Sequence, residues 1–191
     1  RHDNVPALRL YERFGFTEVD RRSEFELEPI ARGPRTELCC LEKLQSSQQQ
    51  ALFDLVRRAE GPGHHWLHKI QRKKYVLSAD ERLFERIESL FSGRVETRWA
   101  IPGQWELRAG MILSAARWWN RAAHQLRLWV HPNSRGQIEK ELVDDALALL
   151  SRYPGRATSI SLPACEERAM AALRAVGFNH VRTLVLMKVD L

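Results

Sequence analysis

Apolar residues alternate with other residue types along one short stretch in the second half of the chain. From Leu126 to His131 every second residue is a leucine or a valine, and this period of two is typical of a strand with one buried face. Residues 132–136, Pro-Asn-Ser-Arg-Gly, then break the strand. From Ile138 onward the apolar residues recur at helical spacing. The pattern predicts a strand, a tight loop and the N-terminus of a helix.

The loop between this strand and this helix has two interpretations. The first free N–H groups of a helix and the positive end of its dipole can hold a phosphate group. An ordinary strand-to-helix turn gives the same residue pattern, because short motifs of this kind also match by chance. The residues of the loop leave both interpretations open.

The hydrophobic pattern also divides the rest of the chain into elements. Further strands are predicted over 16–20, 24–28, 38–41, 95–101, 105–118, 158–162, 178–182 and 184–189. Helices are predicted over 5–14, 46–59, 79–92, 138–153 and 166–176. Five tryptophans fall on the predicted central strands, where they would fill a core or line an apolar pocket: Trp99, Trp105, Trp118, Trp119 and Trp129.

The end of the chain resembles its beginning. When Gly177-Phe178 is placed over Gly15-Phe16, a shift of 162 positions, both copies read as helix, Gly-Phe, strand, turn, strand. We therefore expect residues 1–30 to be the C-terminal helix and two strands of a preceding, truncated copy. Residues 31–36 would be a linker, and residues 37–191 a complete domain of ordinary length. The chain would then be the C-terminal portion of a longer protein.

Composition and charge narrow the classes of protein to which the chain could belong. The net charge is +6 and the basic residues are dispersed, and no recognised nucleic-acid module is present, so we expect no nucleic-acid partner. No apolar run is long enough to cross a bilayer, and the polar N-terminus is unlike a signal peptide. The three cysteines are an odd number without metal-ligand spacing, which favours reduced thiols. We expect a cytoplasmic protein without a membrane segment.

Three histidines suggest a metal-site hypothesis, because His64 and His68 stand four residues apart with His65 between them. No aspartate or glutamate lies within residues 61–70. Surface histidines are therefore the favoured interpretation, and we expect no metal site.

Two segments resemble the GNAT superfamily of acetyl-CoA-dependent N-acetyltransferases. Residues 4–16, Asn-Val-Pro-Ala-Leu-Arg-Leu-Tyr-Glu-Arg-Phe-Gly-Phe, are similar to the C-terminal signature of that family, and residues 130–136, Val-His-Pro-Asn-Ser-Arg-Gly, are similar to its strand and pyrophosphate loop. The order of the predicted elements also fits. The resemblance implies an α/β (α+β) fold, with a mixed, mostly antiparallel central sheet that is flanked by helices and splays open after the strand 126–131.

The resemblance also implies a cofactor and a reaction. Acetyl-CoA would lie in the cleft where the sheet splays, with its pyrophosphate on the N–H groups of the loop. Its acetyl or other acyl group would pass to a primary amine, while a base or water chain takes up the amine proton and a tyrosine protonates the thiolate. Tyr11 of the first copy matches the family's tyrosine. The residues implied in cofactor binding are Leu128, Val130, Asn133, Ser134, Arg135, Gly136 and Gln137.

The second copy departs from the family pattern at the loop and in the last helix. Ile138 stands where the family has a small residue that lets the backbone approach the phosphates. Glu139 and Glu141 place negative charge near the expected anion site, which is unfavourable. Leu173 stands at the position that Tyr11 has in the first copy.

Three functions follow from these observations. The protein could be an acyltransferase whose activity lies mainly in the first copy. The complete domain could instead transfer the acyl group with other bases, for which Glu96, Glu106 and His124 are the candidates, although such strand residues are more often simply solvated. The third function is that of a degenerate domain that stabilises or regulates its partner or forms a homodimer. The acceptor would be an amine of a small molecule or a peptide.

Overall fold

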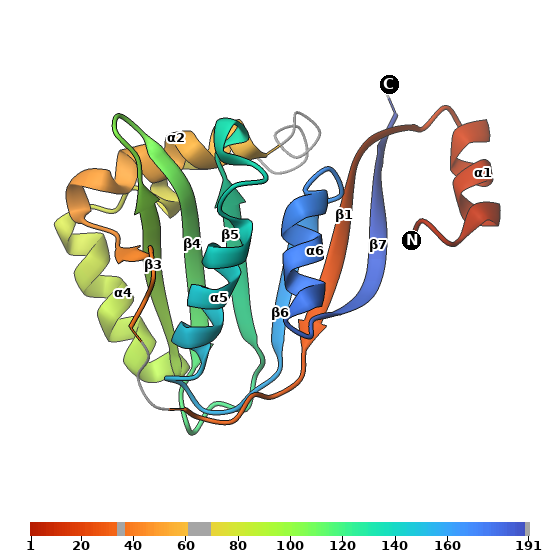
Figure 1. The fold of residues 1–191 in the computed structure, drawn as a ribbon. Helices are drawn as coiled ribbons and strands as arrows, with labels where there is room; N and C mark the ends of the chain where they lie inside the picture. Colours follow the sequence, from red (N-terminus) through yellow and green to blue (C-terminus); the bar gives the residue numbers. More distant parts are fainter. Residues whose placement is uncertain (34–36, 61–69, 190–191) are drawn as a thin grey trace.

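The computed structural model describes residues 1–33, 37–60 and 70–189, and in these ranges seven strands form one sheet (Figure 1). The strand order is β2-β3-β4-β5-β6-β1-β7, and every neighbouring pair is antiparallel except β5 and β6. The predicted mixed, mostly antiparallel α/β fold is confirmed. The strands are β1 (Thr17–Leu27), β2 (Glu42–Lys43), β3 (Arg94–Pro102), β4 (Leu107–Ala116), β5 (His124–Val130), β6 (Thr158–Pro163) and β7 (Asn179–Lys188).

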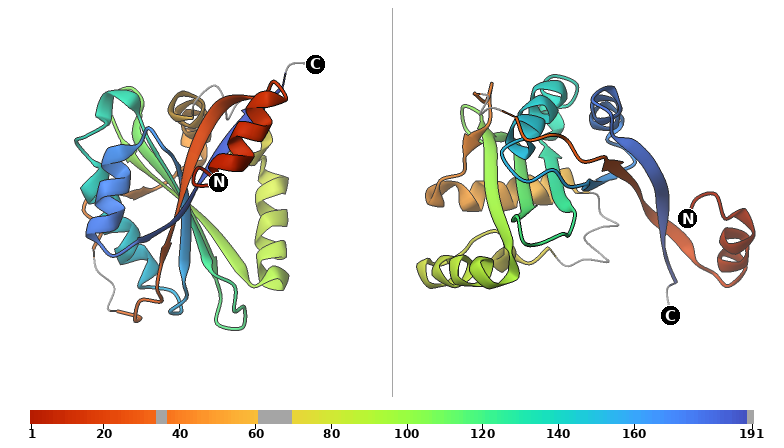
Figure 2. Two further views of the ribbon diagram at one scale, coloured as in Figure 1. Left: turned by 90° about the vertical axis from the view of Figure 1, so that its right-hand side faces the viewer. Right: turned by 90° about the horizontal axis from the view of Figure 1, so that it is seen from below.

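Helices cover both faces of the sheet, as two further views show (Figure 2). The helices are α1 (Val5–Arg13), α2 (Gln49–Ala59), α4 (Ala79–Ser92), α5 (Glu139–Leu150) and α6 (Glu167–Ala175), and the short 3-10 helices are η1 (Ser46–Gln48), η2 (Arg72–Lys74) and η3 (Pro132–Ser134). On one face α5 and α6 share a hydrophobic core with β4, β5, β6 and β1. On the other face α2 packs in a second core with parts of β3, β4 and β5. Burial of apolar surface on both faces drives this layered arrangement.

Two predicted strand pairs are each one continuous strand, so the turns predicted between them are wrong. Residues 17–20 and 24–27 of the first predicted pair belong to β1, and residues 179–182 and 184–188 of the second belong to β7. The segment Arg21-Arg22-Ser23 contains no glycine or proline that would favour a tight turn. Its residues instead pair with β7, and two of them also pair with β6.

The predicted strand over 38–41 is displaced to β2 at Glu42–Lys43. The N–H groups of Cys39, Cys40 and Leu41 donate to the carboxylate of Asp145 on α5, at N···O distances of 2.7, 2.9 and 2.8 Å. A backbone whose N–H groups bond a buried carboxylate cannot offer them to a neighbouring strand. This clamp holds the segment against α5 instead.

Three of the five tryptophans lie outside the strands, contrary to the expectation for the central sheet. Only Trp99 and Trp129 are on strands, β3 and β5. Trp105 lies in the turn before β4 and is 90% exposed. Trp118 and Trp119 follow β4, where their rings stack edge to face with centroids 5.3 Å apart. Trp118 and Trp119 therefore contact each other, and all three side chains are exposed to solvent rather than buried in the core.

Strand β1 lies between β6 and β7, although it is close to the N-terminus in sequence. Its Phe25 is fully buried in the core, beneath Arg174 of α6, and its Leu27 is also buried there. The first 30 residues therefore supply both backbone pairing and apolar side chains to the sheet formed with residues 37–189.

We expect Phe25→Ala to lower the free energy of unfolding by about 3–5 kcal/mol, because the substitution removes a large buried side chain and leaves a cavity. Phe14→Ala is the matched control: Phe14 is on the same N-terminal segment but 67% exposed, and its loss should cost under about 0.5 kcal/mol. Urea denaturation followed by circular dichroism measures both values. Equal effects of the two substitutions would contradict the position of β1 inside the sheet.

Candidate functional site

Strands β5 and β6 pair only at one end and then diverge. Their parallel pairing covers His124 to Leu126 on β5 and ends at Leu126 opposite Ile160. Beyond this point the pairing of β5 with β4 continues to Val130. The N–H of His131 donates to the carbonyl of Arg108 on the β4 side. Hydrogen-bonded and non-hydrogen-bonded pairs alternate along an antiparallel ladder. The N–H groups of Leu128 and Val130 therefore point away from β4, towards the side on which β6 diverges. The predicted splay is confirmed.

The loop after β5 leads directly into the first turn of α5. Gly136 has a φ of +81°, a left-handed conformation that favours glycine, and α5 begins three residues later at Glu139. The N–H groups of Gly136 and Ile138 donate to the carboxylate of Glu139, at N···O distances of 2.6 and 3.2 Å. The loop is therefore capped by a side chain of its own helix, in a geometry related to one half of a capping box.

Three other N–H groups of the loop also bond within the protein. Those of Asn133 and Ser134 donate to Nδ1 and to the carbonyl of His131, and that of Gln137 donates to the carbonyl of Ser134. The side chain of Arg135 forms an ion pair with Glu166 at the start of α6. Burial raises the pKa of Glu166, and the neighbouring Arg135 opposes that shift.

The residues of this region do not fit the acetyl-CoA that the family resemblance implies. The carboxylate of Glu139 lies where the pyrophosphate would accept its hydrogen bonds, and two anions cannot share these N–H groups without strong repulsion. A cavity of about 310 Å³ lies beside Trp129 of β5 and Ser161 of β6. The cavity nearer the loop, beside Val130, is only about 10 Å³, less than a bound organic group needs. Its walls are formed by Ala59, Leu128, Trp129, Val130, Leu162, Pro163, Glu166 and Ala169.

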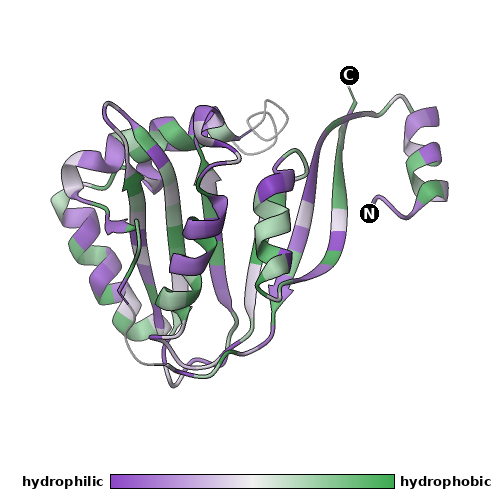
Figure 3. Ribbon diagram, viewed as in Figure 1, coloured by the Kyte–Doolittle hydropathy of each residue, from purple (hydrophilic) through white to green (hydrophobic). Residues whose placement is uncertain are grey.

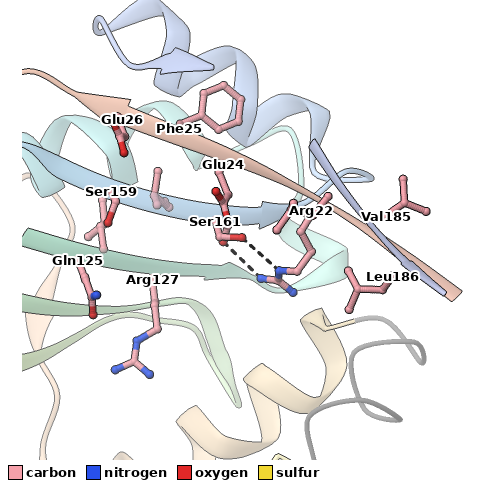
Figure 4. A pocket seen from close by; sticks show the side chains of 13 residues that line it. Arg22, Glu24, Phe25, Glu26, Gln125, Arg127, Ser159, Ser161, Val185 and Leu186 are labelled. Atoms are coloured by element: carbon pink, nitrogen blue, oxygen red, sulfur yellow. Dashed lines mark hydrogen bonds between the residues drawn. The ribbon is translucent and has the colours of Figure 1, made fainter. Parts of the chain in front are cut away.

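A buried polar network bridges the diverging strands. Glu60, the residue after α2, accepts hydrogen bonds from the indole N–H of Trp129 at 2.9 Å and from the guanidinium of Arg22 at 2.6 Å. Arg22 also donates to the hydroxyl and the carbonyl of Ser161, both at 3.3 Å (Figure 4). One arginine of β1 thus ties together α2, β5 and β6. The sequence analysis missed this network, because no local pattern links residues 22, 60 and 129.

Arg22 also borders a cavity with a volume of about 690 Å³. Figure 4 shows the cavity lined by side chains of β5, β6, β1 and β7, with Arg127 and Gln125 extending from β5. Both signs of charge line this cavity, since its lining includes Glu24 and Glu26 as well as Arg22 and Arg127. The lining therefore selects for no single charge.

His124 is the first residue of β5, at the end of the strand opposite to the loop. Its side chain is 2% exposed. Nδ1 accepts from the N–H of Ala116 at 2.9 Å, and Nε2 lies 2.9 Å from the carbonyl oxygen of Pro154, to which it donates. Both ring nitrogens are thus engaged, which leaves no lone pair for a proton from a substrate.

The other candidate catalytic side chains lie apart and are engaged by neighbours. Glu96 on β3 forms ion pairs with Arg98 and Arg127, at 3.0 and 2.8 Å. Glu106, in the turn before β4, pairs with Arg58 and lies 3.0 Å from Nε2 of His131.

Tyr11 is on α1, beyond the β7 edge of the sheet, and is 48% exposed (Figure 1). Its ring contacts that of Phe16, with centroids 5.6 Å apart. At the equivalent repeat position, Leu173 is fully buried in the core. The structure therefore does not bring Tyr11 to the loop that precedes α5.

The metal-site hypothesis concerned His64, His65 and His68. These three residues lie outside the described ranges, so the expectation of no metal site stays a prediction. Within the described residues no cluster of histidine, cysteine, aspartate and glutamate could hold a metal ion. The helices of the described ranges include none that is long and apolar enough to span a membrane.

Comparison with known proteins identifies the fold. No family model and no curated protein matches the sequence, but solved structures do. A GCN5-related N-acetyltransferase from Sphaerobacter thermophilus is 15% identical, with a TM-score of 0.59 over 96% of this chain and 56% of the other. A GNAT-family acetyltransferase from Colwellia psychrerythraea is 15% identical, with a TM-score of 0.52 over 90% and 56%.

A tandem GNAT protein from the clavulanic acid biosynthesis pathway is 16% identical, with a TM-score of 0.53 over 96% of this chain and 57% of the other. The chain thus spans a little over half the length of these structures. At such identities the similarity shows the fold, which is that of the GNAT superfamily.

Stability should fall as the pH drops below 6.5, because of His124. Burial lowers the pKa of His124 below its ordinary value of 6.5. Just below pH 6.5 the imidazole is therefore protonated in the unfolded chain but still neutral in the folded one. The contribution of His124 is fully present above pH 6.5 and is lost as the pH falls further.

We expect His124→Gln to be less stable at pH 8 by about 1–2 kcal/mol but to lose less stability between pH 7 and pH 5. Urea denaturation at a series of pH values measures both effects. The same acid-side loss in both proteins would show that His124 is not the group responsible.

Proposed function

We propose that this chain, which has the fold of the GNAT superfamily, is part of an N-acetyltransferase that transfers an acetyl group from acetyl-CoA to a primary amine. Within it, residues 37–191 form a domain that does not hold acetyl-CoA itself and serves as the structural half of the enzyme. The three cysteines are free thiols, which supports the cytoplasm as the compartment.

The similarity of the fold supports the acetyltransferase part of this proposal, and the bonds between the loop and Glu139 carry the structural role of residues 37–191. A helix N-terminus preceded by a left-handed glycine is a good anion site, because its N–H groups and dipole point at the ligand. Here the anion is supplied by the chain, since the Glu139 carboxylate accepts from Gly136 and Ile138. A phosphate would have to displace the Glu139 carboxylate, which loses little entropy on binding because it belongs to the same chain.

The contacts of the three candidate bases, all of which lie in the described ranges, also support a structural role. The lone pair of His124 is used by a backbone N–H, and the carboxylates of Glu96 and Glu106 are held by arginines. Leu173, which cannot protonate a thiolate, stands at the repeat position of Tyr11. Catalysis would then belong to the domain to which Tyr11 is attached.

Glu139→Ala should create a measurable site for CoA. The unaltered chain should give no binding heat in calorimetry at about 1 mM CoA. In the variant, two N–H groups become available and one negative charge is lost. Because each hydrogen bond to a charged group contributes about 1.5–3 kcal/mol, we expect at least a tenfold gain in affinity, roughly 1.4 kcal/mol.

Glu141→Ala is the matched control, because it removes the same charge from the same helical turn without changing the bonds of the loop. Glu141 is exposed and lies in the first turn of α5. An equal gain in both variants would assign the effect to net charge rather than to the bonds of Glu139. Micromolar binding of CoA by the unaltered chain would contradict the proposal.

A further inference from the structure

The backbone of residues 1–16 repeats in residues 163–178, bond for bond. The N–H of Asn4 donates to Arg1, and 162 positions later the N–H of Glu166 donates to Pro163. Two further bonds recur in the same way, Leu8 to Asn4 with Met170 to Glu166, and Phe16 to Tyr11 with Phe178 to Leu173. Arg1 therefore has the repeat position of Pro163, which is the last residue of β6.

The pairing of β1 with β7 has the same symmetry. Thr17 pairs with Lys188 and Glu26 with Asn179, and each of these pairs becomes the other when the two repeats are exchanged. Arg22 pairs with Leu184, its own repeat equivalent, and so marks the centre. The register shifts at residues 19 and 181 are also 162 positions apart. A local twofold axis thus relates the two strands and their neighbours.

The outer edges of β1 and β7 begin with the same hydrogen bond. On β1, the N–H of Ala164 donates to the carbonyl of Arg21 at 2.8 Å, and the ladder with β6 continues from there. On β7, the N–H of His2 donates to the carbonyl of Thr183 at 2.9 Å. Within the described residues β7 is the last strand of the sheet. Figure 3 shows that β7 has more hydrophobic residues along its length than β1. A long hydrophobic edge strand presents unpaired N–H and C=O groups to which another strand can bind.

Helix α1 is less buried than its repeat equivalent α6. Helix α6 packs three apolar side chains into the core, those of Ala169, Met170 and Leu173. Helix α1 has no buried residue. Three exposed apolar side chains lie on one side of it, those of Leu10, Tyr11 and the C-cap residue Phe14. An apolar stripe of this kind is typical of an interface.

We propose that the outer edge of β7 and the apolar face of α1 bind a second domain of the same fold, whose strand equivalent to β6 is joined directly to Arg1. Five residues before Arg1 would run antiparallel along β7, opposite Val185–Val189. The two domains would share the central β1–β7 pair, because each places one strand inside the sheet of the other. This proposal is independent of the proposed function, since it requires neither bound CoA nor activity.

The direction of the chain at Arg1 favours this occupant over a second copy of residues 1–191. The bond from His2 to Thr183 already starts an antiparallel ladder, so the residue before Arg1 would lie beside Val185. A second copy would have to pair its own β7 with the edge of β7 at which Arg1 and His2 already lie, and the bond from His2 to Thr183 would be in its way. Continuity with the existing ladder therefore favours a strand of the same polypeptide.

A disulfide tests the register in the full-length natural protein. Leu186 and the residue two positions before Arg1 would form a non-hydrogen-bonded pair, in which the side chains approach closest. We expect Leu186→Cys, combined with cysteine at that upstream position, to give an intrachain disulfide on mild oxidation, identified by mass spectrometry. Val185→Cys with the same upstream cysteine is the control, and it should give at least about tenfold less, because a one-residue slip turns the side chain to the other face.

Three results would overturn the proposal. Equal cross-linking in the two variants would show that the register is not fixed. A disulfide between two chains would show that a second copy occupies the edge. A natural chain that begins at Arg1 would leave no residue to form the strand. None of these results would alter the CoA binding expected for Glu139→Ala, so the two proposals fail separately.

Discussion

The pairing of β1 along both of its edges is the interaction on which the rest of the structure depends. A strand inside a sheet satisfies its N–H and C=O groups on both sides, whereas an edge strand satisfies only half of them. Strand β1 bonds β6 on one side and β7 on the other, and it places Phe25 in the core. Without β1, both neighbouring strands would expose an edge and part of the core would meet water.

The divergence of β5 from β6 is the second constraint, because it leaves backbone groups of the two strands without a neighbouring strand. Side chains of the protein bridge this gap. Arg22 and Glu60 bridge the gap, and Trp129 completes the network. At the loop, Glu139 does what a bound anion would do, because it accepts hydrogen bonds from N–H groups at a helix N-terminus. A fold can thus keep its backbone geometry while side chains take the positions of a ligand. Function must therefore be argued from the residues of the site rather than from the fold.

Local signals in the sequence predicted the helices well, because capping depends on residues only a few positions apart. The side chain of Asn4 accepts the N–H of Ala7, and Ser78 forms a capping box with Glu81. The strands were harder to predict. The segment 21–23 looked like a polar turn, yet it is the middle of β1, and the apolar segment 38–41 is held by Asp145 rather than by a strand. In both cases the deciding partner lies more than 100 positions away.

Residue patterns along the chain were enough to predict the positions of the helices, the strand-loop-helix segment around Gly136 and the repeat that relates residues 15–16 to 177–178. Only the tertiary structure decided that β1 enters the sheet between β6 and β7, that His124 is locked between two backbone groups, and that the Glu139 carboxylate turns back onto its own loop. The physical reason is that helix caps and periodicity are local, whereas strand pairing, burial and the occupation of a site depend on contacts between residues that only the folded chain brings together.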